Sequence, residues 1–515
     1  MAHFEAPPEG ATTGDLSGAG TVFRNRAFVY LWSAQTLSQL ASNMVLAALM
    51  ATVRRTTGSD TAVAVLILTF LVPAVLFSTL GGVLVERSNA KVIMLATNVV
   101  RAFGIIAFVF VAPTTATANV PLVYLINFVI ATATAIFAPA ELTSIPRIVE
   151  RRHLMVANSV FVLTINATFA IGFGFLGPLV LNVFGPIAVY IVVAAMFGLA
   201  ALAILPLPAV APERITTSVG DAAGRAFHEV ADQLAEGIRF VRQHRVIAWS
   251  LAYLGVSSSL IGVLGAIGPG FAVDILGLSE ENFFFIMGPA GLGAVGGILF
   301  LNSYGKRVPK RLLIDIGLVA MGVTLVLLAV IRPLATVFGA ATAPIEDVVP
   351  ALAPLLSLIA IVVFVAIFAG IEYSFVAIPA QTALQEELPP NVRGRIFGIL
   401  NTLLSVASFV PVLVAPAAAD IINLFWEGAG IPVVMALLGT LTLWAGVASW
   451  RRNSRAGLHR HDRAAGQAGR EPAYGIIAET EAPGLPSAPD PVGMGERSEA
   501  PHRHRRRRRR AADDD

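Results

Sequence analysis

The chain contains twelve stretches of mostly apolar residues, each long enough to cross a lipid bilayer as a helix. About 18 to 20 such residues suffice, and a helix satisfies its own backbone hydrogen bonds in lipid. Composition agrees, since 56% of the 515 residues are apolar and only 13% are charged. We therefore expect an all-α membrane protein with twelve transmembrane helices in two six-helix bundles. The stretches lie near residues 28–52, 61–85, 91–112, 121–142, 155–181 and 186–206, and near 246–271, 281–303, 311–332, 352–377, 396–418 and 428–450.

Basic residues in the short connections between these stretches predict the orientation of the chain. Lys and Arg concentrate on the cytoplasmic side of membrane proteins. Three lie in one set of connections, and two of them, Arg54 and Arg55, are interpreted as side chains that extend to the outer membrane interface. The opposite set is much richer, so both termini are expected in the cytoplasm. It holds Arg87, Lys91, Arg147, Arg151, Arg152, Lys306, Arg307, Lys310, Arg311, Arg393 and Arg395.

The charged segments between and beyond the bundles divide the chain into five parts. We expect a cytoplasmic N-terminal segment over 1–27, a first bundle over 28–206, a central cytoplasmic loop over 207–245, a second bundle over 246–450 and a disordered cytoplasmic tail over 451–515. The six arginines at 505–510 are offset by acids at 513–515, so no nucleic-acid partner is expected. In the central loop, apolar residues at helical spacing predict an amphipathic helix on the membrane surface, namely Phe227, Val230, Leu234, Ile238 and Val241.

One short signature occurs twice, 240 residues apart, at the cytoplasmic end of an apolar stretch. Pro139-Ala140 precedes Arg147, and Pro379-Ala380 precedes Arg393. A helix–loop–helix element repeated in two hydrophobic halves is typical of carriers, in which the halves enclose a pathway.

The connection after the second stretch carries a longer motif, Gly82-Val-Leu-Val-Glu86-Arg87-Ser-Asn-Ala-Lys91. It resembles the G-x-x-x-D-R-x-G-R-[RK] signature of the major facilitator superfamily, with Glu86 in place of Asp, Asn89 in place of Gly and Ala90 in place of Arg. The resemblance, which extends over about residues 25–450, implies an inner gate. Gly82 would let two helices touch, and the charged side chains would hold the cytoplasmic side closed. We assign to this gate Gly82, Glu86, Arg87, Lys91, Arg101, Arg393 and Arg395.

Further motifs narrow the resemblance to one branch of that superfamily. Phe137-Ala-Pro139-Ala140, followed by Ala157-Asn158-Ser159, is similar to the fourth-to-fifth helix region of the enterobactin and macrolide exporter branch. Ile378-Pro379-Ala-Gln381, followed by Arg393-Gly394-Arg395, is similar to its tenth-to-eleventh helix region. The resemblance implies proton-coupled efflux of amphipathic small molecules, of the drug or siderophore type, by a monomer in a bacterial cytoplasmic membrane. A lysophospholipid flippase or an uptake facilitator of the same fold stays open as the alternative.

Charged residues inside the apolar stretches are candidates for coupling, because a charge in hydrocarbon is costly. Glu372 is the proton-coupling candidate; it is predicted about a turn and a half from the cytoplasmic end of its stretch, so a gate role stays open. Asn98 and Arg101 occupy the position of an Asp-x-x-Arg pair in the branch, and we expect Arg101 to bridge to Glu86. Two other acids are interpreted as structural, Glu141 and Asp315.

Polar residues in the first and fifth stretches are candidates for a substrate cavity. Such side chains either join helices or line a cavity, and both alternatives stay open. The candidates are Gln35, Gln39, Asn43 and Asn166. Gly172, Gly174 and Gly177-Pro178 resemble the glycine–proline motif of antiporters, with close helix packing as the alternative.

Enzymes are a poor match to this sequence. It lacks a P-loop, so ATP is not the expected energy source. It has no cysteine, and its histidines between residues 4 and 458 lie in connections, so neither a metal nor a cofactor is expected. A polytopic membrane enzyme is a remote alternative. The expected partners are the substrate, protons and membrane lipid.

Overall fold

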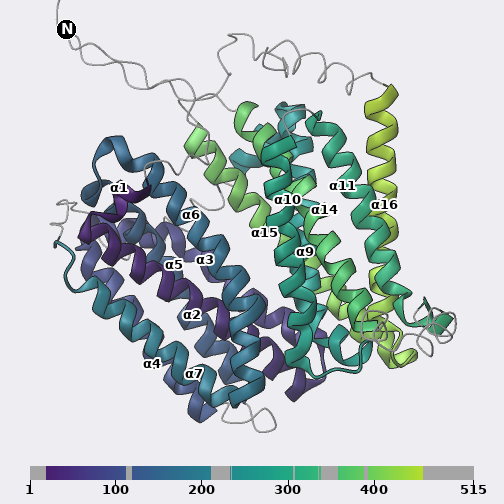
Figure 1. The fold of residues 1–515 in the computed structure, drawn as a ribbon, viewed down its shortest axis with the longest axis horizontal. Helices are drawn as coiled ribbons and strands as arrows, with labels where there is room; N and C mark the ends of the chain where they lie inside the picture. The colour runs from purple at the N-terminus through teal and green to yellow at the C-terminus, as the bar shows by residue number, and fades with distance from the viewer. Residues whose placement is uncertain are drawn as a thin grey trace, which may run out of the picture. The chain divides into compact units, whose positions relative to one another are not determined.

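The computed structural model is almost entirely helical over the residues that it describes, which confirms the predicted all-α fold (Figure 1). Several predicted features lie outside the described residues, among them the polyarginine run and Phe227, Val230, Leu234, Lys306 and Arg307. The division of the chain near 206 and 246 stays a prediction. The described residues are 19–111, 119–209, 232, 235–304, 308–334, 336–337, 358–387 and 393–455.

Residues 19–204 form a first group of helices, which we call the first half. Several of these helices begin with a polar cap, as Asn25 does for α2, where its Oδ1 accepts from the backbone N–H of Ala27 at 3.0 Å. The elements are α1 (Ala19–Phe23), α2 (Arg26–Thr57), α3 (Asp60–Arg87), α4 (Ala90–Val111), α5 (Val120–Ile148), η1 (Arg151–His153), α6 (Leu154–Ile171), η2 (Gly172–Leu176) and α7 (Gly177–Ile204). Among them, α2 packs on α7, α3 on α5, and α4 on both α5 and α7.

Residues 245–455 form the second half. Small residues let its helices approach closely: a Cβ on Gly293 or on Gly370 would overlap a backbone oxygen of the facing helix. The last helix continues to Arg455, past the predicted end at 450, and the Arg452 guanidinium stacks on Trp249 at 3.7 Å. The elements are α9 (Arg245–Asp274), η3 (Glu280–Phe283), α10 (Phe284–Tyr304), α11 (Lys310–Ala329), α14 (Leu358–Glu387), α15 (Arg393–Phe425) and α16 (Gly430–Arg455).

Twelve membrane spans can be counted in the described residues. Ten helices are long and apolar enough to cross a bilayer, and one of these, Val156–Ile204, has 49 residues. Gly185 interrupts it with φ 79° and ψ 177°, a backbone conformation that favours glycine. The chain reverses at Gly185, because residues before and after it lie at the same end of the bundle. Thr164 bonds to Trp32 near the start of α2, and Leu205 accepts from Lys91 at the start of α4, and these two helices begin at the same end. This break gives eleven spans, and the shorter apolar helix Ile286–Leu301 is the twelfth.

The spans have two ends, which we name by the chain. The hairpin end is where α2 meets α3, at residues 57–60, and α9 and α15 also finish there. The terminal end is where α2 begins and α16 finishes. At the terminal end, the side chain of Asn25 donates to Ile148 O at 2.8 Å, and residues 235–243 form part of the predicted central helix.

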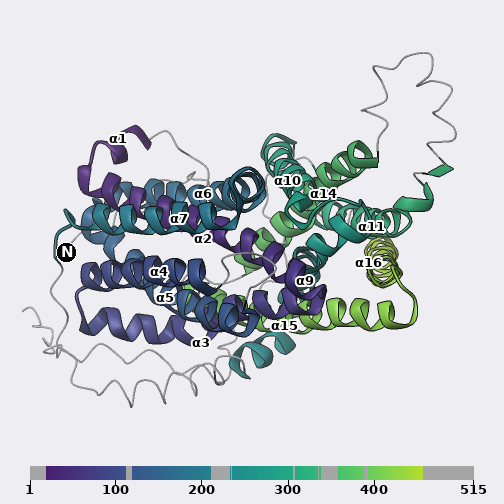
Figure 2. The same cartoon turned by 90° about the horizontal axis from the view of Figure 1, so that it is seen from below.

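The two halves share an apolar core at the hairpin end. The cluster around Met44, Leu66 and Phe173 of the first half also includes Ala272 and Phe283 of the second half. The contacts between the halves include α3 with α15, which lie side by side in Figure 2. They also include α3 with α9, and α2 with η3. The cluster at the terminal end of the first half is built from residues 22–207. The hairpin end is therefore where side chains of both halves pack into one core.

Candidate functional site

The turn between α2 and α3 brings an arginine and an aspartate to one point. α2 ends at Thr57 and is capped by Gly58, whose φ of 66° is left-handed and whose N–H donates to Arg54 O at 2.7 Å. Ser59 follows as the cap of α3, where its Oγ accepts from the N–H of Ala62 at 3.1 Å. Asp60 is thus the first residue of α3, beside the last turn of α2.

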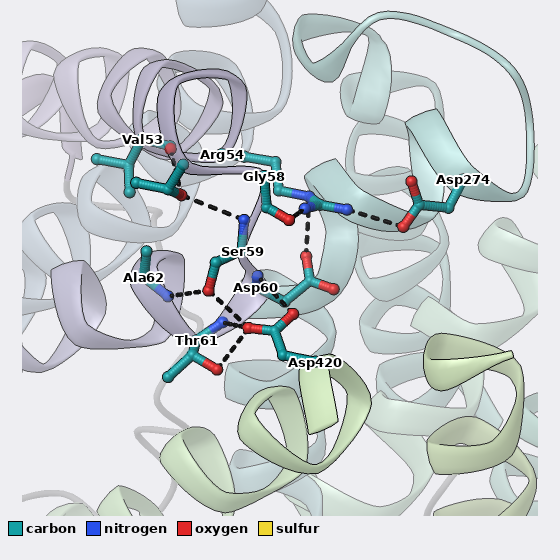
Figure 3. A network of polar contacts seen from close by, with 10 residues as sticks. Val53, Arg54, Gly58, Ser59, Asp60, Thr61, Ala62, Asp274 and Asp420 are labelled. Carbon is teal, nitrogen blue, oxygen red and sulfur yellow. Dashed lines mark hydrogen bonds and ion pairs between the residues drawn. The ribbon is translucent and has the colours of Figure 1, made fainter. Parts of the chain in front are cut away.

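Arg54 links this turn to the second half of the protein (Figure 3). Its Nε lies 3.1 Å from Asp60 Oδ1, and its Nη2 donates to Asp274 Oδ2 of α9 at 2.8 Å. Its Nη1 donates to Gly58 O. Only 7% of the Arg54 side chain is exposed, so its interpretation as a side chain at the membrane interface is wrong.

Arg55 also contacts the second half. Its Nε donates to Glu280 Oε2 of η3 at 2.9 Å, and nearby the Asn182 side chain donates to Asn282 at 3.1 Å. Both arginines therefore form an ion pair with an acid far along the chain, and for Arg55, whose side chain is 34% exposed, the interface interpretation stays a prediction.

Asp420 of α15 binds the first turn of α3. Its carboxylate accepts from the hydroxyls of Ser59 and Thr61, both at 2.6 Å, and from the N–H groups of Thr61 at 2.9 Å and Asp60 at 3.1 Å. The start of a helix presents free N–H groups and a positive partial charge, so it suits a carboxylate. Asp420 thereby joins the halves through α3 as Asp274 does through α2.

Asp60 has the fewest hydrogen bonds of the three acids Asp60, Asp274 and Asp420. It is fully buried, and neither of its carboxylate oxygens accepts a hydrogen bond within the described part of the chain. It also lies against the backbone of α9, since a Cβ on Gly270 would overlap Asp60 Oδ1. We call Arg54, Asp60, Asp274 and Asp420 the latch.

Sequence analysis missed the three acids of the latch. Asp60, Asp274 and Asp420 each lie within three residues of the end of a predicted stretch, on the side of the membrane that also carries Arg54 and Arg55. Three acids and two arginines at one set of span ends were the available signal.

A second charged group lies within the first half, around Arg101 of α4. The Arg101 side chain is 1% exposed, and its guanidinium stacks on Phe137 at 4.6 Å and on Phe197 at 4.9 Å. Its electrostatic partner is Glu141 of α5, which is also buried. The expected bridge from Arg101 to Glu86 stays a prediction, because the side chain of Glu86 lies outside the described residues.

The predicted cavity residues do not share one environment. Gln35 is fully buried, and neither atom of its amide has a hydrogen-bond partner among the described residues. One turn further, Ser38 donates to Asn98 Oδ1 at 2.8 Å and so ties α2 to α4. Gln39 and Asn43 are partly buried, and the side chain of Asn166 lies outside the described residues.

The glycines of the fifth and sixth spans lie at helix crossings. Cβ atoms on Gly172 and Gly177 would come within about 3 Å of α2 at Asn43 and Met44. Gly174 faces Gly288 of α10, where a Cβ on Gly288 would lie 3.1 Å from Gly174 O. The segment Gly172–Leu176 is a π-helix, a form that often marks functional sites. Close packing, the alternative to an antiporter motif, is what these contacts provide.

Glu372 lies at the middle of α14. The helix continues through Pro379 to Glu387, ten residues past the end of the predicted apolar stretch, so Glu372 is about four turns from the end of the helix. Its depth in the membrane stays a prediction. Glu372 Oε1 accepts from the hydroxyl of Thr324 of α11 at 2.8 Å. Its Oε2 is buried and has no hydrogen-bond partner within the described chain.

The structure describes some residues of the predicted inner gate, among them Gly82 and Lys91. A Cβ on Gly82 would meet open space, whereas one on Gly81 would lie 2.9 Å from Pro139 Cγ, so Gly81 makes the close helix contact predicted for Gly82. Lys91 Nζ donates to Leu205 O at 2.6 Å, at the end of α7. The side chains of four further candidates lie outside the described residues, namely Glu86, Arg87, Arg393 and Arg395.

Asp315 joins α11 to α16 near the terminal end of the second half. It is fully buried and accepts from Ser449 Oγ at 2.5 Å and from Asn453 Nδ2 at 2.9 Å. Tyr253 of α9 bonds to the same serine at 2.8 Å. Among the described residues, no group of three or more His, Cys, Asp or Glu side chains could hold a metal ion.

Comparison with known proteins places this helix arrangement in a family. The model of the Major Facilitator Superfamily matches residues 31–411. The uncharacterized MFS-type transporter YfiS of Bacillus subtilis (strain 168) is 22% identical over 440 residues, covering 82% of this chain and 94% of YfiS.

Solved transporters share the fold at low identity. The nucleoside transporter NupG has a TM-score of 0.59 at 15% identity, over 82% of this chain and 99% of NupG. A bacterial homologue of the human lysosomal transporter Spinster, inward-facing and unoccupied, has a TM-score of 0.58 at 13% identity, over 86% and 98% of the two chains. Because the family model covers most of the twelve spans, the chain belongs to the Major Facilitator Superfamily of membrane transporters.

Proposed function

We propose that the protein is a proton-coupled exporter of amphipathic small molecules, of the drug or siderophore type, and that Glu372 carries the coupled proton. The observation that supports the proposal is the position of Glu372, a carboxyl at the centre of a membrane-spanning helix. Export as the direction of transport rests on the motifs around Pro139 and Pro379, which resemble those of an exporter branch.

The surroundings of Glu372 favour a group that binds and releases a proton. An ionised carboxylate inside a membrane needs a cation or several hydrogen-bond donors. Among the described residues, Glu372 has one donor, the hydroxyl of Thr324, and its second oxygen has none. A proton supplied from one side of the membrane would neutralise it, and its release to the other side would complete a transport cycle.

The contacts between the halves suit alternating access. The halves share a core and a polar group at the hairpin end. With the basic connections in the cytoplasm, the hairpin end faces outward, so this conformation is closed on the outside. Rocking of one half against the other would open it.

Transport by purified protein in liposomes tests the proposal. We would measure movement of a fluorescent amphipathic amine, with and without an imposed pH gradient, for the wild type and Glu372→Gln. Gln keeps the volume and the acceptor for Thr324 but removes the titratable proton. Glu386→Gln is the matched control, because Glu386 is on the same helix and is an exposed partner of Lys310.

We expect Glu372→Gln to lose gradient-driven transport while it still exchanges substrate down the substrate's own gradient, and Glu386→Gln to behave as wild type. Gradient-driven transport by Glu372→Gln at the wild-type rate would overturn the role of Glu372. Movement of lysophosphatidylcholine, with no dye transport and no dependence on the pH gradient, would replace the exporter by the flippase.

A further inference from the structure

The latch holds more negative than positive charge. Asp60 and Asp274 form ion pairs with the Arg54 guanidinium, and Asp420 accepts from the backbone N–H of Asp60. The side chains of Arg54, Asp60 and Asp274 are 7%, 0% and 26% exposed. If all three acids were ionised, the latch would carry two excess negative charges, one of them on the fully buried Asp60. Burial of uncompensated charge is costly, so one carboxyl is expected to take up a proton.

Hydrogen bonding distinguishes the three acids. Asp420 accepts four hydrogen bonds, and Asp274 accepts one from Arg54, so both are stabilised as carboxylates. Asp60 accepts none within the described chain. The Nη donors of Arg54 are directed to Asp274 and to Gly58 O, which leaves only the Nε contact for Asp60.

The charged and titratable side chains around Asp60 come from four helices. From α2 comes Arg54, from α9 Asp274 and from α15 Asp420, while the next ion pair outward is Arg55 with Glu280. On α5, Tyr124 donates its hydroxyl to Ala62 O at 2.8 Å. Arg54 is therefore the cation of the latch, and its charge is shared with Asp274.

We propose that Asp60 is a proton-binding site of this protein, which is occupied while the halves are joined at the hairpin end and releases its proton when they part. Separation removes Asp274 and Asp420 and admits water, so the ionised form of Asp60 then becomes favourable. The site is distinct from Glu372, and it does not depend on the proposed direction or substrate of transport.

The sign of the pH dependence follows from this assignment. The joined state binds one proton more than the parted state, so acid favours the joined state and alkali the parted one. For one proton, the ratio of joined to parted molecules changes by at most about tenfold per pH unit. A sodium ion is the competing ligand for such a group of acids, and the guanidinium at its centre argues against it.

The test follows the distance between the halves in the full-length protein. The chain has no cysteine, so spin labels can be placed at Phe184→Cys and Leu424→Cys, both at exposed positions near the hairpin end of opposite halves. Distances would be measured by pulsed electron paramagnetic resonance in lipid nanodiscs between pH 5 and pH 8. We expect longer distances as the pH rises, and a short distance at every pH for Asp60→Asn, which imitates the protonated acid.

Glu427→Gln is the control, because it removes an exposed acid from the connection between α15 and α16, close to the label at 424, and should keep the wild-type response. An unchanged pH response in Asp60→Asn would overturn the proposal. A long distance at every pH would overturn it too, because it would mean that the ionised carboxylate of Asp60 holds the halves together. A response that follows sodium at constant pH and ionic strength would assign the site to that ion instead.

If Asp60→Asn does not fold, as judged by gel filtration and thermal unfolding, Asp420→Asn provides the decision. Removal of the neighbouring negative charge weakens proton binding at Asp60, so the midpoint of the response should move to lower pH. A midpoint that stays in place would contradict proton binding at Asp60.

Discussion

Arg54 and Asp274 are 220 residues apart in the sequence, and their side chains form an ion pair with an Nη2–Oδ2 distance of 2.8 Å. The pair joins the end of α2 to the end of α9, so it is made only while the two halves are together. Breaking a buried ion pair on one side leaves an uncompensated charge and costs about 3–5 kcal/mol.

Arg54→Gln should therefore shift the protein toward the parted state. We expect a loss of about 3 kcal/mol from the joined state, about a hundredfold in the ratio of the two states, seen as a longer distance between labels at positions 184 and 424. Arg55→Gln is the control. Its ion pair with Glu280 is more exposed, so its loss should change the ratio by less than tenfold. Equal effects of the two variants would contradict a special role for Arg54.

Gly270 permits the close approach of Asp60 to α9. A methyl group there would overlap Asp60 Oδ1, so Gly270→Ala should weaken the joined state by about 1–3 kcal/mol, as overpacking does. Gly265→Ala on the same helix has no atom within 4 Å of the new Cβ and should be neutral or slightly stabilising. Thermal unfolding and the label distance would both be measured, and a wild-type result for Gly270→Ala would show that Asp60 does not need this contact.

Arg101 and Glu141 should behave as a coupled pair within the first half. Arg101→Met leaves Glu141 buried without its cation, at a cost of about 3 kcal/mol in the free energy of unfolding. Adding Glu141→Gln removes the orphaned charge, so the double variant should recover most of that loss. Denaturation of the two single variants and the double variant gives the coupling free energy directly. Additive effects would show that the two residues do not interact.

Removal of the polar tail should be harmless only if the last helix is kept whole. Truncation after Arg455 should leave expression and unfolding temperature unchanged, because the sequence beyond it has too little apolar content to form a core. Truncation after Arg452 also removes Asn453, which is buried and bonded to Asp315, and should destabilise the protein by about 1–3 kcal/mol. Asn453→Ala in the full-length chain should reproduce that loss.

Hydropathy was sufficient to predict the fold, because each span satisfies its own backbone and must be apolar over its whole length. The same signal ended the tenth stretch at residue 377, whereas α14 continues through Pro379 to Glu387. The partners of Arg54 could not be predicted, because they are brought together by helix packing across 220 residues for Asp274 and by the approach of α15 for Asp420. Local spacing also could not decide which of two adjacent glycines, Gly81 or Gly82, faces α5.

The reversal at Gly185 has a mechanical consequence. No loop separates the helix before this glycine from the helix after it, so a force on one is transmitted to the other without slack. Pulled from the membrane by a single-molecule probe, the 49 residues of Val156–Ile204 should come out in one step. Spans joined by longer connections should come out of the membrane one at a time.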